Sequence, residues 1–380
     1  MTNDPVYLDH NATTPVAPEV ADAIGPYLRE HFGNPSSGHV YGQRAKQAVD
    51  QARGEVAALL GAAPDEITFT GCATEANNLA ILGVARALGG NKKHLVTSAV
   101  EHPSVTQPCL RLREEGWEVS IVPVDGAGRI DLQAVEQALR PDTALVSVMH
   151  ANNEAGTIQP IAEIARLTRP RGILLHSDAA QSIGKIAVNV DELGVDLLTL
   201  AGHKFYAPKG VGALYVRKGT ALAPVLAGAG HEHGLRPGTE NVPFAVALGC
   251  AARLAHDHLP TAQTRLKALR DQLHLQLLAG IPQLVLNGHA EARLPNTLNV
   301  SFPGVSGHEL LAVAARDVAA STGSACHAGG HAVSGVLGAM GASPERAAGA
   351  VRLSVGTGTT PADIDRAARA LIATWRQLRT

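Results

Sequence analysis

Apolar positions recur along residues 44–217 in two alternating patterns. Residues 44–61 place apolar side chains every three or four positions and stop at Gly61, which predicts an amphipathic helix. Similar patterns predict helices at 73–88 and 161–170. Short apolar runs bounded by polar or glycine residues predict strands between them, at 67–71, 94–98, 119–124, 143–149, 173–179, 197–202 and 212–217. Such alternation of apolar strands and helices predicts an α/β fold with a mostly parallel sheet covered on both faces.

The pattern changes after about residue 255. A helix is predicted at 264–280, strands at 284–288 and 297–302, and a final helix at 361–378 that starts at Pro361. A chain of 380 residues usually divides into domains, so we expect a large domain over 15–255 and a smaller α+β domain over 256–380. Residues 1–14 are too polar and irregular to assign to an element, and we group them with the smaller domain.

Composition excludes several classes of protein. Aromatic residues make up only 3% of the chain, the formal net charge is -2, and lysine and arginine form no cluster, so we expect no nucleic-acid partner. We expect no membrane association either, because no apolar run is long enough to span a bilayer. The four cysteines are far apart and form no CxxC pair, which favours a reducing, cytoplasmic location.

Polar groups directly follow five of the predicted strands. Ligands bind at these carboxyl ends of the strands in parallel α/β sheets. Each alone is explained by helix capping or surface exposure, but the five together indicate a site. The set contains a helix start suited to a phosphate, an aspartate suited to a pyridinium nitrogen, and a lysine that can react with a carbonyl. These are the requirements of pyridoxal 5'-phosphate (PLP). The five are Ala73–Thr74, Glu101–His102, Asn152–Glu154, Asp178–Gln181 and His203–Lys204.

An ordered series of motifs resembles the cysteine desulfurases, in the class V branch of the fold-type I PLP enzymes. The resemblance extends from residue 7 to about residue 365 and implies a seven-stranded, mostly parallel sheet in the large domain and a small domain that contains a cysteine loop. The motifs are YLDHNATT, FGNPSSGH, ATEANN, EHPSV, VMHANNEAGTIQP, HSDAAQSIGK, GHKFYAPKGVGALY, RPGTENV, TGSAC and VRLSVGTGTT.

The resemblance implies a role for each cofactor residue. Lys204 would bind PLP covalently, Asp178 would hold the ring nitrogen, and Gln181 would lie near the ring hydroxyl. His102 would stack on the ring and assist proton transfer. The phosphate would be bound by Ala73, Thr74 and His203, and by Thr239 of a second subunit, so the resemblance implies a homodimer.

The resemblance also implies the reaction. L-cysteine would be converted to L-alanine, and its sulfur would pass to Cys326 as a persulfide for delivery to an acceptor protein, for example in iron–sulfur cluster assembly. A segment of small residues around the thiol suits a nucleophile that must approach the substrate and then move away. The substrate carboxylate would be bound by Asn34, Asn153 and Arg352. Arginine suits that task through bidentate hydrogen bonding, although a structural salt bridge is the alternative for Arg352.

Other interpretations stay open at this point. Cys326 could be a buried structural cysteine, or it could bind a metal with His327 and His331, although no fourth ligand is near and we expect no metal site. Selenocysteine lyase, acting on L-selenocysteine, is the alternative function. A non-catalytic dimeric partner, or an aminotransferase or β-lyase that does not need Cys326, is a more distant one.

Two positions depart from the common pattern of the resembling family. Ala201 stands where many members have a serine, which could remove one hydrogen bond to the phosphate. His10 stands where asparagine is common, and the sequence offers no account of its effect.

Overall fold

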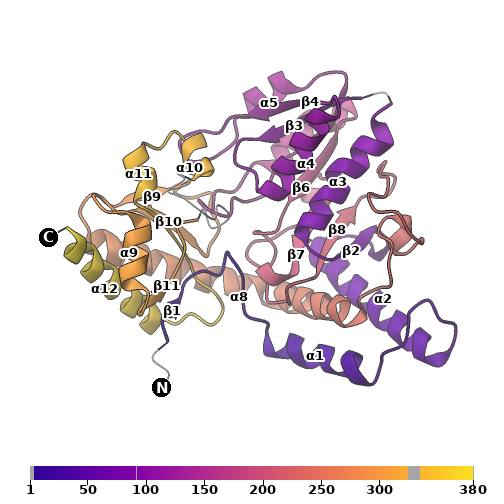
Figure 1. Cartoon of the computed structure of the whole chain (residues 1–380), viewed down its shortest axis with the longest axis horizontal. Coiled ribbons are helices and arrows are strands. Elements are labelled where there is room, and N and C mark those ends of the chain that lie inside the picture. The colour runs from indigo at the N-terminus through magenta and orange to yellow at the C-terminus, as the bar shows by residue number, and fades with distance from the viewer. Residues whose placement is uncertain (1–3, 91, 324–333, 380) are drawn as a thin grey trace.

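A seven-stranded sheet forms the centre of the larger part of the molecule (Figure 1). The computed structural model describes residues 4–90, 92–323 and 334–379. Within them the strand order is β2-β8-β7-β6-β5-β3-β4, and every neighbouring pair is parallel except those that include β8. The predicted mostly parallel sheet is therefore confirmed. The strands are β2 (Ile67–Thr70), β3 (His94–Ser98), β4 (Glu118–Val122), β5 (Thr143–Ser147), β6 (Leu174–Asp178), β7 (Leu197–Ala201) and β8 (Gly212–Val216).

Helices cover both faces of this sheet, which explains why its central strands are apolar at consecutive positions. Successive residues of one strand enter opposite hydrophobic cores, as Leu145 and Val146 of β5 do. One face packs against α3 (Ala73–Leu88) and α4 (Pro103–Glu114). The other packs against α1 (Pro18–Arg29), α2 (Val40–Leu60), α5 (Leu132–Ala138), α6 (Ile161–Thr168), α7 (Val190–Leu193) and the first half of α8 (Val242–Gly280).

The smaller part of the molecule contains a separate hydrophobic core and an antiparallel sheet in the order β12-β10-β9. Its strands are β9 (Val285–Asn287), β10 (Thr297–Ser301) and β12 (Ala350–Ser354). The N-terminal segment, which the sequence pattern could not assign, forms β1 (Val6–Tyr7) and pairs in parallel with β11 (Val318–Ala319). The surrounding helices are α9 (Gly307–Ala314), α10 (Gly335–Ala339), α11 (Pro344–Ala348) and α12 (Pro361–Leu378).

Helix α8 links the two parts (Figure 1). Its residues from Val242 to Ala252 enter the core of the large sheet, and those from Leu266 to Leu277 enter the smaller core. The sequence predicted only its second half, because Pro260 interrupts the pattern and proline usually ends a helix. The division near residue 255 falls within this helix and stays a prediction. In the part of the chain that the structure describes, no helix combines the length and apolar character that a membrane span requires.

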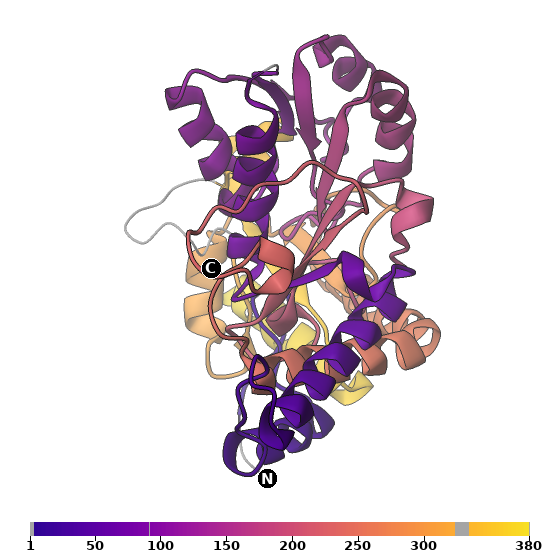
Figure 2. The ribbon, with the colours of Figure 1, turned by 90° about the vertical axis from the view of Figure 1, so that its right-hand side faces the viewer.

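The crossing of α2 and α8 depends on a glycine (Figure 2). A Cβ added at Gly249 would lie 2.5 Å from Ala52 Cα and 3.0 Å from the Ala52 carbonyl oxygen. Both are atoms of the α2 backbone, which cannot turn away as a side chain can. The two helices therefore approach as closely as they do because residue 249 has no side chain.

We predict that Gly249→Ala destabilises the protein. Overpacking of this kind costs about 1–3 kcal/mol, which outweighs the gain of up to about 1 kcal/mol from replacing glycine by alanine within a helix. Gly54→Ala in α2 is the matched control, because an added Cβ there meets nothing within 4 Å. Urea unfolding of both variants tests this: a lower midpoint for Gly249→Ala and an unchanged or higher midpoint for Gly54→Ala are expected, and equal midpoints would contradict the packing argument.

Candidate active site

Lys204 lies where the sequence placed it, directly after β7, in the short 3₁₀ helix η3 (Gly202–Lys204). Its side chain is half-buried. The Nζ atom donates hydrogen bonds to the carbonyl oxygens of Asn11 and Ala12, both at 2.7 Å. The N-terminal segment therefore contacts the end of this strand and holds the amine between two acceptors.

Asp178 is the last residue of β6, the strand next to β7, and it is buried. Its Oδ1 accepts from the Ala180 N–H at 2.9 Å and its Oδ2 accepts from Asn77 Nδ2 at 2.8 Å. A carboxylate has about four acceptor positions, so Asp178 can accept a further donor. A buried carboxylate held in this way suits the role predicted for it beside a protonated ring nitrogen.

His102 caps the N-terminus of α4, just after β3. Its Nδ1 accepts from the Ser104 N–H at 3.1 Å, which requires the proton of the neutral ring to be on Nε2. Burial lowers the pKa of His102, and the charge of Lys204 lowers it further, while Asp178 opposes both. The imidazole is therefore neutral near pH 7.

Asn77 joins Asp178 to His102, a role that the sequence pattern did not predict. Its Nδ2 donates to Asp178 Oδ2 and to Ser104 Oγ, each at 2.8 Å, and Ser104 Oγ lies 2.8 Å from His102 Nδ1. A signal existed in the motif ATEANN, since Asn77 lies one helical turn after Ala73 on an otherwise apolar face. Only the tertiary structure shows which two groups it connects.

Ala73 and Thr74 are the first residues of α3, and the N-cap residue, Cys72, makes no side-chain capping hydrogen bond. The backbone of β8 approaches closely, because a Cβ at Gly212 would lie 3.1 Å from the Ala73 nitrogen. A helix N-terminus without a side-chain cap binds anions through its N–H groups and its dipole. The arrangement fits the predicted phosphate site.

His203 lies in η3, directly before Lys204, and is neutral. Burial lowers its pKa to about 4, with smaller contributions from Lys204, Lys209 and Lys185. Its Nδ1 lies 3.2 Å from Thr13 Oγ1. Ala201, which replaces the common serine, is buried at the end of β7.

Gln181 is buried close to Lys204 and contacts the same acceptor. Its Nε2 donates to the Asn11 carbonyl at 3.0 Å, and its Oε1 accepts from Lys185 Nζ at 2.8 Å. Asn11 and Lys185 were not among the predicted site residues. Both occur in the quoted motifs YLDHNATT and HSDAAQSIGK, but neither follows a predicted strand directly.

The residues predicted to bind the substrate carboxylate are not all brought together. Arg352, buried in β12, donates from Nη1 to the Asn153 carbonyl at 3.0 Å and from Nη2 to Asp9 Oδ1 at 2.8 Å. The structural salt bridge considered above is therefore present, and the substrate role of Arg352 stays a prediction. Asn34 is exposed, and its Oδ1 accepts from the Ser36 N–H within its own turn.

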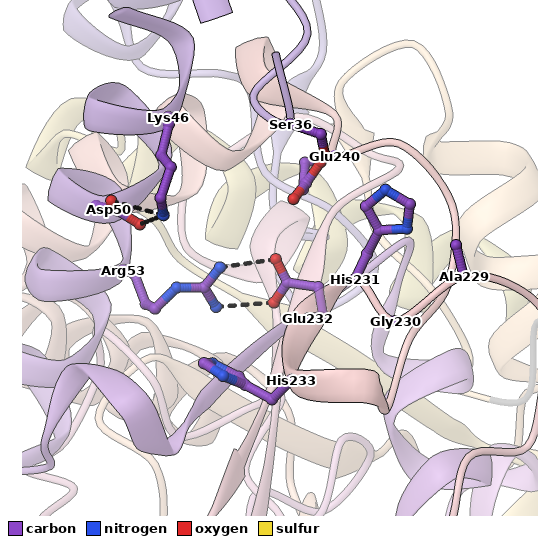
Figure 3. A pocket seen from close by; sticks show the side chains of 10 residues that line it. All are labelled: Ser36, Lys46, Asp50, Arg53, Ala229, Gly230, His231, Glu232, His233 and Glu240. Carbon is purple, nitrogen blue, oxygen red and sulfur yellow. Dashed lines mark hydrogen bonds and ion pairs between the residues drawn. The ribbon is translucent and has the colours of Figure 1, made fainter. Parts of the chain in front are cut away.

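Thr239 is exposed in the segment before α8. A buried ion pair holds the start of this segment: Arg53 and Glu232 form two hydrogen bonds of 2.7 Å (Figure 3). The pair also caps the free edge of β2, because Arg53 donates to the Ile67 carbonyl and Glu232 accepts from the Phe69 N–H. The pocket that they line has a volume of about 460 Å³.

Cys326, His327 and His331 lie outside the described residues. The described residues on either side of them contact Glu154 of the NNE motif. Its Oε2 accepts from Ser334 Oγ at 2.5 Å, and a Cβ at Gly323 would lie 3.1 Å from the same oxygen. Glu154 thus contacts residues on both sides of this segment, and one of them, Ser334, is the N-cap residue of α10.

His10 is buried, and its ring lies against Gly356 of the VRLSVGTGTT motif. A Cβ at position 356 would lie 2.2 Å from His10 Cε1. Burial lowers the pKa of His10 to about 4, and the charge of Lys185 contributes. The departure at residue 10 therefore adds a neutral ring for which Gly356 leaves room.

These residues fit PLP. The helix start without a side-chain cap, and the space that a Cβ at Gly212 would fill, suit the phosphate. A buried carboxylate and an amine held by two carbonyls lie at the ends of two neighbouring strands. A model of the aminotransferase class-V family matches residues 6–367. The chain belongs to this family.

The similarity to known proteins extends over nearly the whole chain. Cysteine desulfurase IscS of Dictyoglomus turgidum is 46% identical over 99% of this chain and 95% of its own length. The mitochondrial cysteine desulfurase of Arthroderma benhamiae is 46% identical over 97% of this chain and 74% of its own. A solved structure of a NifS-like protein has a TM-score of 0.91 and 37% identity, and the match covers 99% of both chains.

Membership of the class-V family confirms several predictions. The fold is that of a fold-type I PLP enzyme, the chain is an enzyme, and its cofactor is PLP. The relatives from Dictyoglomus turgidum and Arthroderma benhamiae are cysteine desulfurases, which favours that function over the selenocysteine lyase alternative. The roles of individual residues stay predictions.

Glu101, next to His102, is a buried carboxyl group that the sequence analysis placed at a strand end without a role. Its Oε1 accepts from Ser98 Oγ at 2.5 Å, and both carboxyl oxygens accept from the Met149 N–H at 3.0 and 3.1 Å. Burial raises the pKa of Glu101 to about 8 despite these hydrogen bonds, and the charge of Asp178 adds to the rise. The group is therefore largely protonated at pH 7 and places little negative charge beside Asp178.

We predict that Glu101→Gln makes stability less dependent on pH. In the wild type, the folded state keeps a proton that the unfolded state releases above its ordinary pKa of 4.5, so the free energy of unfolding falls as pH rises from about 4.5 to 8. Glutamine resembles the protonated acid and removes this loss. Melting temperatures of the PLP-loaded proteins at pH 5, 6.5 and 8 should shift in favour of the variant as pH rises. The exposed Glu114→Gln should follow the wild type, and parallel curves for all three proteins would contradict the prediction.

Proposed function

We propose that this enzyme is a cysteine desulfurase, which converts L-cysteine to L-alanine and transfers the sulfur to Cys326. The supporting observation is similarity over nearly the full chain to curated cysteine desulfurases, at 46% identity, in a chain whose strand ends assemble the residues that PLP chemistry needs. A further solved relative, SspA in complex with cysteine, is 38% identical with a TM-score of 0.82 over 92% of this chain.

PLP, when bound, supplies an electron sink that stabilises negative charge on the substrate carbon. In this proposal the phosphate is held at the N-terminus of α3 by Ala73 and Thr74, together with His203. Asp178 holds a proton on the ring nitrogen, and Gln181 lies near the ring hydroxyl. Asn77 keeps the Asp178 carboxylate in place by donating to Oδ2.

Lys204 and His102 transfer protons in this proposal. The carbonyls of Asn11 and Ala12 stabilise the Lys204 Nζ when it takes up the proton from the substrate Cα, because each accepts a hydrogen bond from it. His102 is neutral with its proton on Nε2, since Nδ1 accepts from the Ser104 N–H, so Nε2 is the atom that donates. The neutral His102 can therefore donate a proton from Nε2 near pH 7.

Sulfur then moves to Cys326. The Cβ–S bond of cysteine breaks as an S–S bond forms with the Cys326 thiolate, and the electron pair of the broken bond stays with the carbon. Cβ gains a proton and Cα regains the one that Lys204 took up, so the products are alanine and a persulfide on Cys326. Arg352, Asn153 and Asn34 are proposed to bind the substrate carboxylate, for which Arg352 would exchange its partner Asp9. The acceptor of the persulfide is proposed to be a sulfur-carrying protein, as in iron–sulfur cluster assembly.

The proposal includes a homodimer, in which Thr239 of one subunit reaches the phosphate bound by the other. The exposure of Thr239 and the buried Arg53–Glu232 pair behind it support this arrangement. We also propose a large domain over 15–255 and a small domain over 1–14 and 256–380, since two separate hydrophobic cores divide in this way. The four separated cysteines support a cytoplasmic location.

We predict that Cys326→Ala abolishes sulfur transfer but keeps the cofactor. The wild type should release alanine from L-cysteine in step with sulfide formed in the presence of a reducing thiol. The variant should form no sulfide while its visible absorption band is unchanged, because Cys326 is the acceptor and not a PLP ligand. Cys250→Ala is the matched control and should keep full activity.

The same assay with L-selenocysteine separates the alternatives. Turnover of selenocysteine alone by the wild type would replace the proposal with the lyase function. Unchanged sulfide release by Cys326→Ala would indicate a β-lyase.

We predict that subunits with complementary defects restore activity when mixed. Lys204→Ala should be inactive, and Thr239→Asp should bind PLP poorly because the carboxylate repels the phosphate. A heterodimer of the two contains one intact site if Lys204 and Thr239 act together across subunits. Unfolding and refolding the mixture should therefore recover about a quarter of wild-type activity, since half of the dimers are mixed and each has one site of two. No recovery would show that the two residues act within one subunit.

A further inference from the structure

Lys185 is a second buried lysine at the candidate active site, and the mechanism above does not use it. It lies in the turn that follows β6, four residues after Gln181, and its exposed fraction is 5%. Lysine is almost never fully buried unless its amine has partners, so its contacts indicate what it does.

The Nζ of Lys185 meets two oxygen atoms of side-chain amides. It donates to Gln181 Oε1 at 2.8 Å and lies 3.5 Å from Asn11 Oδ1. Gln181 in turn donates from Nε2 to the Asn11 carbonyl, the same oxygen that accepts from Lys204 Nζ. The four residues thus form one closed hydrogen-bonded group.

Carbonyl groups, which can only accept, orient the NH₂ ends of both amides, and Lys185 orients the opposite end of Gln181. Gln181 must turn its NH₂ toward the Asn11 carbonyl, which leaves Oε1 for Lys185. Asn11 must turn its NH₂ toward the Asn153 carbonyl, which leaves Oδ1 for Lys185. Lys185 is therefore the donor that satisfies the buried Oε1 of Gln181, whereas Asn11 Oδ1 also accepts from Asn296 Nδ2 at 3.0 Å.

Cationic groups surround Lys185 on several elements. Burial lowers its pKa well below the ordinary value, and Lys204 of η3 and Arg352 of β12 lower it further. Its own charge lowers the pKa of His10 and His203. A lysine placed among other cations, where a charge is costly, is better explained by a function in holding its partners than by a contribution to stability.

We propose that Lys185 is a positioning residue that fixes the side-chain amide of Gln181, so that a donor N–H and not the carbonyl oxygen is held beside Lys204. This inference rests on the proposed use of PLP, in which Gln181 lies near the ring hydroxyl. An N–H donor at that position would stabilise the deprotonated ring oxygen. It would therefore lower the pKa of the proton that this oxygen shares with the Lys204 nitrogen.

The test is the pH midpoint of the visible absorption band of the PLP-loaded enzyme. In Lys185→Met, Oε1 of Gln181 loses its donor, and only the Asn11 carbonyl still orients the amide, so its N–H is held less firmly in place. The proton is then bound more tightly, and the midpoint should rise by about one pH unit, a tenfold change in proton affinity. Lys209→Met is the matched control: Lys209 is exposed and also lowers the pKa of His203, but its midpoint should equal that of the wild type.

A double-mutant cycle separates positioning from a direct charge effect. If Lys185 acts through Gln181, Lys185→Met should shift the midpoint in the Gln181→Ala background by less than half of its shift in the wild type. A shift of half or more in that background would overturn the proposal, because the charge of Lys185 would then act through space. No shift in the wild-type background would overturn it as well.

Folding and cofactor binding are checked separately. If Lys185→Met does not fold by circular dichroism, Lys185→Gln replaces it, since its amide keeps a donor without charge; a smaller shift in the same direction is then expected, and no shift would overturn the inference. Failure of the wild type to develop a visible band with PLP would refute the proposed function itself, and the two failures are therefore distinguishable.

Discussion

Buried polar groups need hydrogen-bond partners, and where the two cores meet this requirement is met largely by Asn11. The N-terminal segment passes between the two parts of the molecule before it enters α1 (Figure 1). Asn11 is 1% exposed, and its backbone and side chain both make hydrogen bonds. Its partners are Asn153, Gln181, Lys185, Lys204, Asn296, Thr297 and Ser354. One residue thus connects the reactive lysine on the large sheet with β10 and β12 of the smaller part.

The charges around this point favour an anionic ligand. Lys204 and Arg352 lie close enough to Lys185 to lower its pKa, and Glu101 adds little negative charge because burial keeps it largely protonated near pH 7. His10 and His203 are neutral, since burial lowers the pKa of each to about 4. A phosphate and a carboxylate, the anionic groups of PLP and of an amino acid, suit such surroundings.

Two hydrogen-bonded groups then hold the predicted cofactor residues. On one side Asn77 joins Asp178 to Ser104 and so to His102. On the other side Lys185 and Asn11 hold Gln181. A reactive site needs the groups that contact the substrate and cofactor to be fixed in place. In this enzyme the side-chain amides of Asn77 and Asn11 hold several of them by hydrogen bonds.

Local pattern determined the elements and the reactive positions. The predicted strands overlap β2–β10, and Lys204, Asp178 and His102 lie at strand ends as expected, because hydrophobic periodicity and chain order are local properties. The sequence pattern did not predict that α8 is continuous, because Pro260 alone indicates a helix end. Packing of the two halves of α8 against two hydrophobic cores stabilises the helix across this proline.

Only the tertiary structure decided which side chains pair with one another. The pairing of Arg352 with Asp9 joins residues 343 positions apart, and that of Asn77 with Asp178 joins residues 101 apart. The sequence by itself determined which residue types stand at the sheet edge, their order along the chain, and through its motifs the family. The hydrogen bonds between these residues depend on their burial and on short distances between them. Both arise only when the two hydrophobic cores have formed.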